Sequence, residues 1–202
     1  IALVRERYAE QHKRVSDPSW RAGLRGQQLL DAGRNAEAER AFLQSLRGYP
    51  REAEFLGGLG MALMRQGRRA QAIAYFQRAV QATPAGDTSD RWRDLITSTR
   101  YWLLLDQADT ALAAARLDDA QALYSQARRQ QPREINAILG LVDVAVARGD
   151  DEAAERQLQA ARRIAPRDAN VIRKLVQLYG RTDPQRLESF INALPAAQRT
   201  LY

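Results

Sequence analysis

Few side chains in this sequence could carry out catalysis or hold a metal ion. His12 is the only histidine and cysteine is absent, which excludes a histidine pair, a cysteine nucleophile, a disulfide and a Cys-ligated zinc site. His12 stands between Gln11 and Lys13, a polar context typical of a solvated helix position. We therefore expect no catalytic residue, no cofactor and no metal ion, and a protein that is not an enzyme.

Acidic residues gather at two places, Asp118-Asp119 and Asp150-Asp151-Glu152, which could suggest cation sites. Each group stands where a predicted helix begins. Acidic side chains are favoured there because they accept hydrogen bonds from free backbone N–H groups and interact well with the helix dipole. We interpret both groups as features of helix N-termini rather than as metal ligands.

Arginine dominates the basic residues: of 31 lysines and arginines only Lys13 and Lys174 are lysine, and the net charge is +7. An arginine excess is compatible with phosphate binding, but acidic residues are interspersed throughout, so we expect no nucleic-acid partner. Arg128-Arg129 and Arg162-Arg163 precede prolines at the same position of a repeat. Cations stabilise helix C-termini there, and an anionic partner is the alternative.

The glycines of Gly57-Gly58-Leu59-Gly60 resemble a phosphate-binding loop, but neither the preceding strand nor the Lys-Ser/Thr pair of that motif is present. They fall inside a predicted helix. We expect Gly60 to allow close helix packing, and Gly57 and Gly58 to open a binding face.

The elements that position these residues follow the stretch from Ala53 to Pro84, which predicts two helices joined at Gly67. Small residues of one helix face large residues of the other, as in the tetratricopeptide repeat (TPR), whose period is about 34 residues. Ala, Leu, Arg and Gln, all good helix formers, dominate the composition. The predicted packing positions are Gly26, Ala38, Phe42, Gly60, Ala72, Phe76, Ala120, Tyr124, Ala154 and Leu158.

The predicted fold is all-α, a right-handed TPR superhelix (an α-solenoid of antiparallel helix pairs) in which stacked neighbours complete each core. No apolar run reaches the ~18 residues of a membrane-spanning helix, so we expect no membrane insertion. The chain begins with Ile1 and shows no signal peptide, so we take it as an excised fragment. The expected segments are an N-terminal helix left from a preceding repeat (1–18), repeats at 19–52 and 53–85, an irregular repeat with an extended first helix (86–134), a repeat at 135–168, and a partial repeat with a C-terminal helix (169–202).

The irregular repeat breaks the period, since Pro84 and Pro132 are 48 residues apart. Its second helix is regular, so the first must absorb the surplus. We expect one long helix from Arg91, bent near Thr97-Ser98-Thr99; a short helix followed by a normal one is the alternative.

A TPR array usually binds partners on the concave face formed by the first helices of its repeats. Tryptophans suit protein interfaces or sugar stacking, although packing within the array is the other use for them. The paired Lys/Asn/Arg cluster with which chaperone-tail-binding TPR proteins hold a carboxylate is missing. The candidate binding residues at the customary positions are Trp20, Met61, Met64, Arg65, Trp102, Asp109 and Asp143.

The irregular repeat carries a more specific resemblance. The stretches Arg91-Trp92-Arg93-Asp94-Leu95-Ile96 and Thr99-Arg100-Tyr101-Trp102-Leu103-Leu104 are similar to the corresponding part of the cellulose synthase operon protein C family. The likeness continues through 120–127, 139–145 and 190–194 and covers about residues 86–199, whereas 19–84 matches as generic TPR.

That resemblance implies a slice of a periplasmic TPR array belonging to a protein anchored in the outer membrane. The array is thought to scaffold the bacterial cellulose secretion machinery and to guide the glucan towards the outer-membrane pore. Its implied partners are other secretion subunits or neighbouring repeats, with the glucan chain as a further candidate. The alternative from the residues alone is a generic TPR adaptor that binds a peptide segment of another secretion or regulatory protein.

Overall fold

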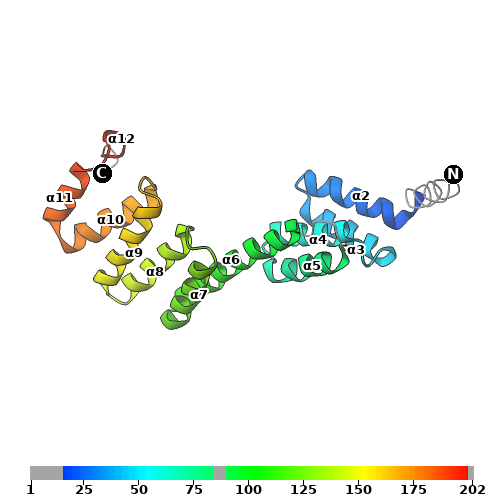
Figure 1. The fold of residues 1–202 in the computed structure, drawn as a ribbon, viewed down its shortest axis with the longest axis horizontal. Coiled ribbons are helices and arrows are strands. Elements are labelled where there is room, and N and C mark those ends of the chain that lie inside the picture. Colours follow the sequence, from blue (N-terminus) through cyan, green and yellow to red (C-terminus); the bar gives the residue numbers. More distant parts are fainter. Residues whose placement is uncertain (1–15, 84–89, 200–202) are drawn as a thin grey trace. The chain divides into compact units, whose positions relative to one another are not determined.

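The computed structural model describes residues 16–83 and 90–199, and within these ranges it contains α-helices and turns but no strand (Figure 1). Most of the helix predicted at 1–18, the loop at 84–89 and the last residues, 200–202, lie outside the described residues. The helices are α2 (Pro18–Asp31), α3 (Asn35–Gly48), α4 (Ala53–Arg65), α5 (Arg69–Ala82), α6 (Asp90–Ala113), α7 (Leu117–Gln130), α8 (Ile135–Ala147), α9 (Asp151–Ile164), α10 (Ala169–Thr182), α11 (Pro184–Asn192) and α12 (Ala196–Arg199).

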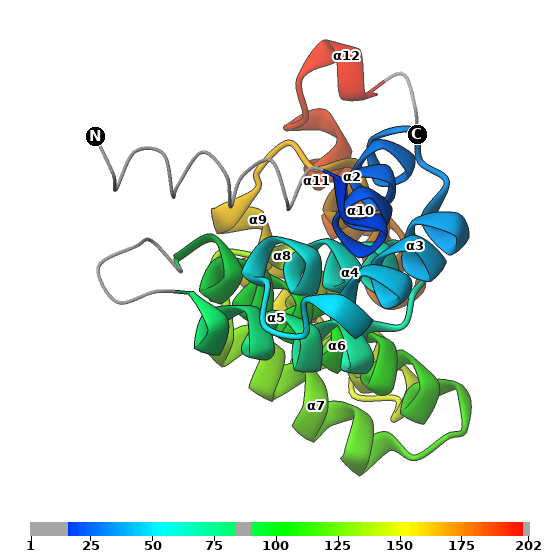
Figure 2. The same ribbon diagram turned by 90° about the vertical axis from the view of Figure 1, so that its right-hand side faces the viewer.

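The chain divides into two compact units, unit 1 (residues 1–103) and unit 2 (residues 104–202). In unit 1, α2 pairs with α3 and α4 with α5, and α3 packs against α4 (Figure 2). In unit 2, α8 packs against both α7 and α9, and α10 packs against α9 and α11. Each unit has its own apolar core, as expected for stacked helix pairs.

All the predicted packing positions are buried. Phe42 and Phe76 of the second helices are fully buried, and each lies against a glycine of the first helix of its own repeat. A Cβ added at Gly26 would come within 2.9 Å of the Phe42 ring, and one at Gly60 within 2.6 Å of the Phe76 ring. The absent side chains therefore provide the space for the aromatic rings.

Gly57 and Gly58 do not open a binding face, contrary to the expectation from the sequence. A Cβ at Gly58 would overlap the ring of Phe42, which belongs to the preceding repeat, and one at Gly57 would overlap the indole of Trp92. Both glycines are buried and receive aromatic rings from neighbouring repeats. Phe42 is consequently held between Gly26 of α2 and Gly58 of α4.

The expectation of one long helix in the irregular repeat is confirmed, because α6 is continuous over 24 residues. Its first turns belong to unit 1, where Trp92 is 4% exposed and stacks on Phe76 with ring centroids 6.2 Å apart. Its last turns belong to unit 2, where Leu105 and Ala108 are buried. The predicted bend near 97–99 stays a prediction.

The turns within repeats use the left-handed backbone conformation. Gly33, Gly67 and Gly149 have φ values of 73°, 77° and 73°, respectively. The corresponding turn between α6 and α7 has Ala115 at φ 56°. An alanine in this conformation costs energy because its Cβ crowds the following carbonyl oxygen.

We predict that Ala115→Gly raises the free energy of unfolding by about 1 kcal/mol, because it relieves this strain. Urea unfolding followed by circular dichroism measures the change. Ala114→Gly is the matched control. It should lower stability, because Ala114 does not have a positive φ that a glycine could relieve. Equal effects of the two substitutions would contradict the interpretation.

We also predict that Gly58→Ala destabilises the protein by about 1–3 kcal/mol, because the added methyl group overpacks against Phe42. Gly180→Ala is the control within another helix, α10. Its Cβ would lie an ordinary 3.7 Å from Leu187, so the better helix propensity of alanine should stabilise the protein by up to about 1 kcal/mol. A neutral or stabilising Gly58→Ala in urea unfolding would refute the packing argument.

Candidate functional site

Among the unit 1 candidates, Trp20 is half-buried and packs by its edge. Its ring centroid lies 5.2 Å from that of Tyr49 and 4.9 Å from that of Phe55. Met61 and Met64 are also half-buried against the core of unit 1. These three side chains therefore contribute to packing between repeats, and only part of each is available to a partner.

Arg65 and Met64 also make polar contacts that tie helices together. Arg65 Nη1 donates a hydrogen bond to the backbone oxygen of Leu30 at 2.6 Å, which satisfies a carbonyl at the end of α2. The hydroxyl of Thr99 donates to Met64 Sδ at 3.4 Å, joining α6 to α4.

Trp102 is the candidate that presents a large apolar surface. Its side chain is 41% exposed, and it contacts Tyr101 edge-on with ring centroids 5.5 Å apart. Trp92, ten residues earlier on α6, is buried in the core of unit 1, and the guanidinium of Arg91 lies 4.0 Å above its ring. Of the three tryptophans, Trp92 is thus used for packing, Trp20 mostly so, and Trp102 faces solvent.

The two candidates of unit 2 are acidic and are held by neighbours. Asp109 accepts a hydrogen bond from the hydroxyl of Tyr124, and Asp143 pairs with Lys174 of the next repeat. Burial raises the pKa of Tyr124 above its ordinary value, and the hydrogen bond to the Asp109 carboxylate raises it further. The phenol therefore stays protonated and donates to Asp109.

The acidic groups at the starts of α7 and α9 behave differently. Asp150 caps α9, since its side chain accepts from the backbone N–H of Ala153 at 2.8 Å. Asp118 and Asp119 lie in the first turn of α7, as the sequence predicts, but no side chain caps this helix, and Asp118 pairs with Arg148 at 2.5 Å. Within residues 16–83 and 90–199, no group of three histidine or acidic side chains gathers that could hold a metal ion. His12 lies outside these ranges.

The paired arginines at the helix ends also have side-chain partners. Arg128 Nη1 donates to Gln157 Oε1 at 2.8 Å, and the guanidinium of Arg162 lies 4.7 Å above the ring of Phe190. Both contacts join α7 or α9 to the second helix of the following repeat. Arg128 and Arg162 thus link repeats, a role that the capping interpretation missed.

Charged pairs between adjacent repeats were not identified from the sequence. Arg68 pairs with Glu39 at 2.6 Å, and comparable pairs join Arg148 to Asp118 and Arg181 to Asp151. The partners are 29 or 30 residues apart in the chain. These pairs could have been predicted from the sequence, because opposite charges recur at a spacing slightly less than one repeat.

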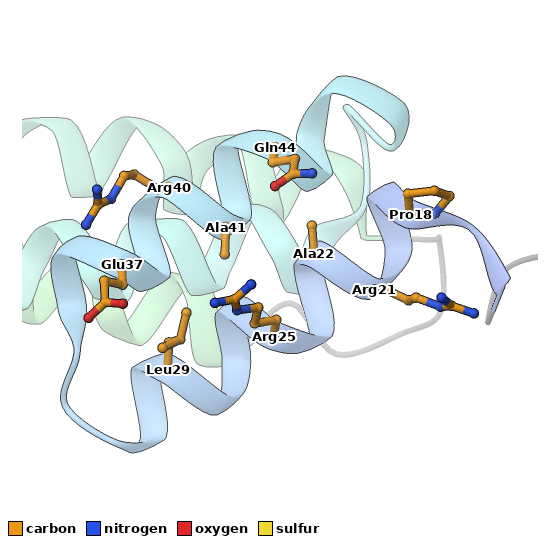
Figure 3. Close-up of a pocket in the computed structure, with 9 residues that line it drawn as sticks. All are labelled: Pro18, Arg21, Ala22, Arg25, Leu29, Glu37, Arg40, Ala41 and Gln44. Atoms are coloured by element: carbon orange, nitrogen blue, oxygen red, sulfur yellow. The ribbon is translucent and has the colours of Figure 1, made fainter.

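A hollow of about 510 Å³ lies on the α2–α3 pair. Ala22, Arg25 and Leu29 line it at the positions that Leu56, Leu59 and Leu63 occupy in the next repeat. In Figure 3, Arg25 lies across the space between the two helices. Arg34, hydrogen-bonded to Glu37 beside this hollow, lowers the pKa of that carboxyl.

Comparison with known proteins identifies the repeats. Profiles described as tetratricopeptide repeat match residues 24–87 and 111–178. Two solved structures of MamA share the fold: MamA 41-end from Desulfovibrio magneticus RS-1 has a TM-score of 0.50 at 17% identity, covering 88% of this chain and 93% of that one. A second MamA structure has a TM-score of 0.51 at 16% identity, covering 87% and 88%.

The sequence is also similar to part of much longer curated proteins. It is 40% identical over 199 residues to cellulose synthase operon protein C of Escherichia coli (strain K12), covering 98% of this chain and 17% of that protein. It is 36% identical over 175 residues to the protein of that name from Xanthomonas axonopodis pv. citri, covering 86% of this chain and 11% of that protein. The resemblance thus extends over nearly the whole chain, and limiting it to residues 86–199 was too narrow. The chain spans about a sixth of the length of the Escherichia coli relative.

The raised pKa of Tyr124 predicts a pH dependence of stability. An unfolded tyrosine ionises near its ordinary pKa of 10.0, whereas folded Tyr124 keeps its proton to higher pH. Its contribution to stability is therefore complete below about pH 10 and is lost as the pH rises through the folded pKa.

We predict that Tyr124→Phe loses less stability than the wild-type protein between about pH 8 and pH 11, because phenylalanine has no proton to lose. At the lower pH the variant should be less stable by about 1 kcal/mol, the worth of the hydrogen bond to Asp109. Urea unfolding at both pH values gives the comparison. A constant difference between the two proteins across this range would contradict the assignment.

Proposed function

Because the chain belongs to the tetratricopeptide-repeat family, we propose that it is a non-enzymatic scaffold segment of the bacterial cellulose secretion machinery. The observation that carries the proposal is the 40% identity over 98% of the chain to cellulose synthase operon protein C of Escherichia coli. Repeat arrays of this kind present extended surfaces to protein partners, and their fold is typical of scaffolds. The proposed partners are other subunits of the secretion machinery or neighbouring repeats.

The proposed binding surface consists of the exposed parts of the first helices. In unit 1 it centres on Trp102, whose exposed indole offers a rigid apolar surface with a polar N–H group at its edge. Met61 and Met64 add adaptable apolar area beside the core. In unit 2 Asp109 and Asp143 would serve as polar contacts in addition to their bonds to Tyr124 and Lys174.

Guidance of the glucan is the finer part of the proposal. An exposed tryptophan stacks well on the apolar face of a sugar ring, and Trp102 has the required exposure. We propose that it contacts the chain of glucose units during export. Titration with cello-oligosaccharides, followed by Trp fluorescence of the wild-type protein and of Trp102→Phe, tests this contact.

The proposed location is the periplasm, in a protein anchored in the outer membrane. This location rests on the similarity to cellulose synthase operon protein C. Among the helices of the described residues, none is both long and apolar enough to cross a bilayer.

We predict that replacing Trp102 with Ser in the full-length protein reduces cellulose secretion several-fold, because the exposed contact surface is lost. Leu43→Ser is the matched control. Leu43 has a similar exposed fraction, 42%, but lies on α3, the second helix of its repeat, outside the proposed surface. Secreted cellulose is measured in a cellulose-producing bacterium, with protein levels followed by immunoblot.

Deleting residues 19–199 from the full-length protein tests the scaffold role itself, and secretion should then be abolished. Normal secretion after the deletion would refute the cellulose role and favour a generic TPR adaptor for a peptide of another assembly. Normal secretion by Trp102→Ser alone would refute only the role of the tryptophan.

A further inference from the structure

A polar groove lies between α7 and α9 in unit 2, on the face built by the second helices of two repeats, with α8 as its floor. Its volume is about 410 Å³. Gln121, Ser125, Arg128 and Arg129 line it from α7, and Gln157 lines it from α9. The floor includes the apolar residues Leu141, Val144 and Ala145. None of these residues belongs to the candidate surface on the first helices.

The corresponding place in unit 1 has apolar side chains instead. Helices α3, α4 and α5 have the same lengths as α7, α8 and α9 and stand 82 residues earlier in the chain. Leu46 and Tyr75 occupy the positions of Arg128 and Gln157, and both pack against the core of unit 1. Two apolar side chains have thus been exchanged for two hydrogen-bonding ones in unit 2.

At the next equivalent position, one repeat later, the arginine already contacts an aromatic ring. Arg162 stands 34 residues after Arg128, but its guanidinium lies over the ring of Phe190. Phe190 takes the place that Gln157 has in the groove, since each stands at the seventh position after the aspartate that caps its helix. Among the three equivalent places in the described residues, an arginine hydrogen-bonded to a carboxamide is therefore found only between α7 and α9.

The charges of the groove are not balanced by its own residues. Arg148, at one end, is paired with Asp118 and bonded to Gln121, and Asp150 caps α9. At the other end, Arg128 is bonded to the neutral Gln157, and no carboxylate pairs with Arg128 or Arg129 in the part of the chain that the structure describes. Two guanidinium groups are thus left without a counterion.

We propose that this groove binds an extended acidic segment of a partner polypeptide. Guanidinium groups bind carboxylates through paired hydrogen bonds, so Arg128 and Arg129 would hold acidic side chains of that segment. Gln121, Ser125 and Gln157 would bond its backbone. The distance along α7 from Gln121 to Arg129 is about 12 Å, which three or four extended residues span.

The chemistry of the lining favours a peptide over a sugar. No aromatic ring lines the groove to stack on a sugar face, and a neutral glucan would leave both arginines without a counterion. This inference does not depend on the cellulose role, so each can fail without the other.

Fluorescence polarisation with labelled hexaglutamate and the full 202-residue chain tests the proposal. We expect saturable binding that weakens with salt, and no binding of a labelled hexaglutamine. Arg129→Gln should weaken binding about tenfold, the effect of losing one charged hydrogen bond. Arg163→Gln is the matched control, because Arg163 is exposed at the same position of the next repeat, and it should change binding less than about twofold.

A second variant keeps the test independent of simple charge loss. Arg128→Leu combined with Gln157→Tyr installs the residues of unit 1, and it should abolish binding while urea unfolding shows stability that is unchanged or increased. In the wild-type protein, the side-chain amide NMR signals of Gln121 and Gln157 should shift on titration with hexaglutamate.

Three results would overturn the proposal. The first is absence of hexaglutamate binding at millimolar concentration, and the second is equal weakening by Arg129→Gln and Arg163→Gln. The third is displacement of the peptide by inorganic phosphate at matched ionic strength, which would show a simple anion site instead.

Discussion

The arrangement of unit 1 depends on one ring, that of Phe42, seated between glycines of two successive repeats. Gly26 of α2 and Gly58 of α4 both lack the Cβ that would overlap it, and the ring itself is fully buried. Phe42 therefore fixes the distance from α3 to its own partner helix and to the first helix of the next repeat at once. Tyr124 and Gly140 repeat the second of these contacts in unit 2. A repeat in this chain is thus incomplete without its neighbour, as the stacking of solenoids requires.

The break in the period follows from the same contact. Phe76 lies against Gly60 of its own repeat, as Phe42 lies against Gly26. At the position in the next helix where α4 has Gly58 against Phe42, α6 has Trp92 against Phe76. The indole stacks on Phe76 and fills the space at Gly57. A large ring in place of a bare backbone cannot allow the usual close approach, so the regular register ends there. The longer α6 then buries Trp92 and Ile96 in unit 1 and a different set of side chains, including Leu105 and Ala108, in unit 2.

The sequence was sufficient for contacts within a repeat and insufficient for contacts between repeats. Gly26 facing Phe42 and the long α6 follow from spacing alone, because both partners lie within one repeat of the pattern. The destinations of Gly57 and Gly58 do not, since their partners, Trp92 and Phe42, belong to neighbouring repeats. A signal existed in that Gly58 and Gly140 stand at the same position of the first helices α4 and α8, which are equally long.

The same limit applies to the candidate binding residues. Customary positions on the first helices give exposure only if no neighbour uses the side chain, and Arg65, Asp109 and Asp143 are each bonded to another helix. Trp102 is the exception because α6 turns it away from both buried stripes. Residue type alone could not predict that Trp102 is 41% exposed while Trp92, also on α6, is buried.

Position in the repeat therefore does not determine what a residue does. Arg128 and Arg162 are equivalent by sequence, yet one meets a carboxamide beside an open groove and the other an aromatic ring. The difference arises one repeat further along the chain, where Gln157 meets Arg128 and Phe190 meets Arg162. Because packing residues must satisfy the period while the others need not, departures from the pattern are where a binding surface can develop without loss of the fold. The polar exchange at Arg128 and Gln157 is such a departure, and it leaves both helices anchored by the buried Ala127 and Leu158.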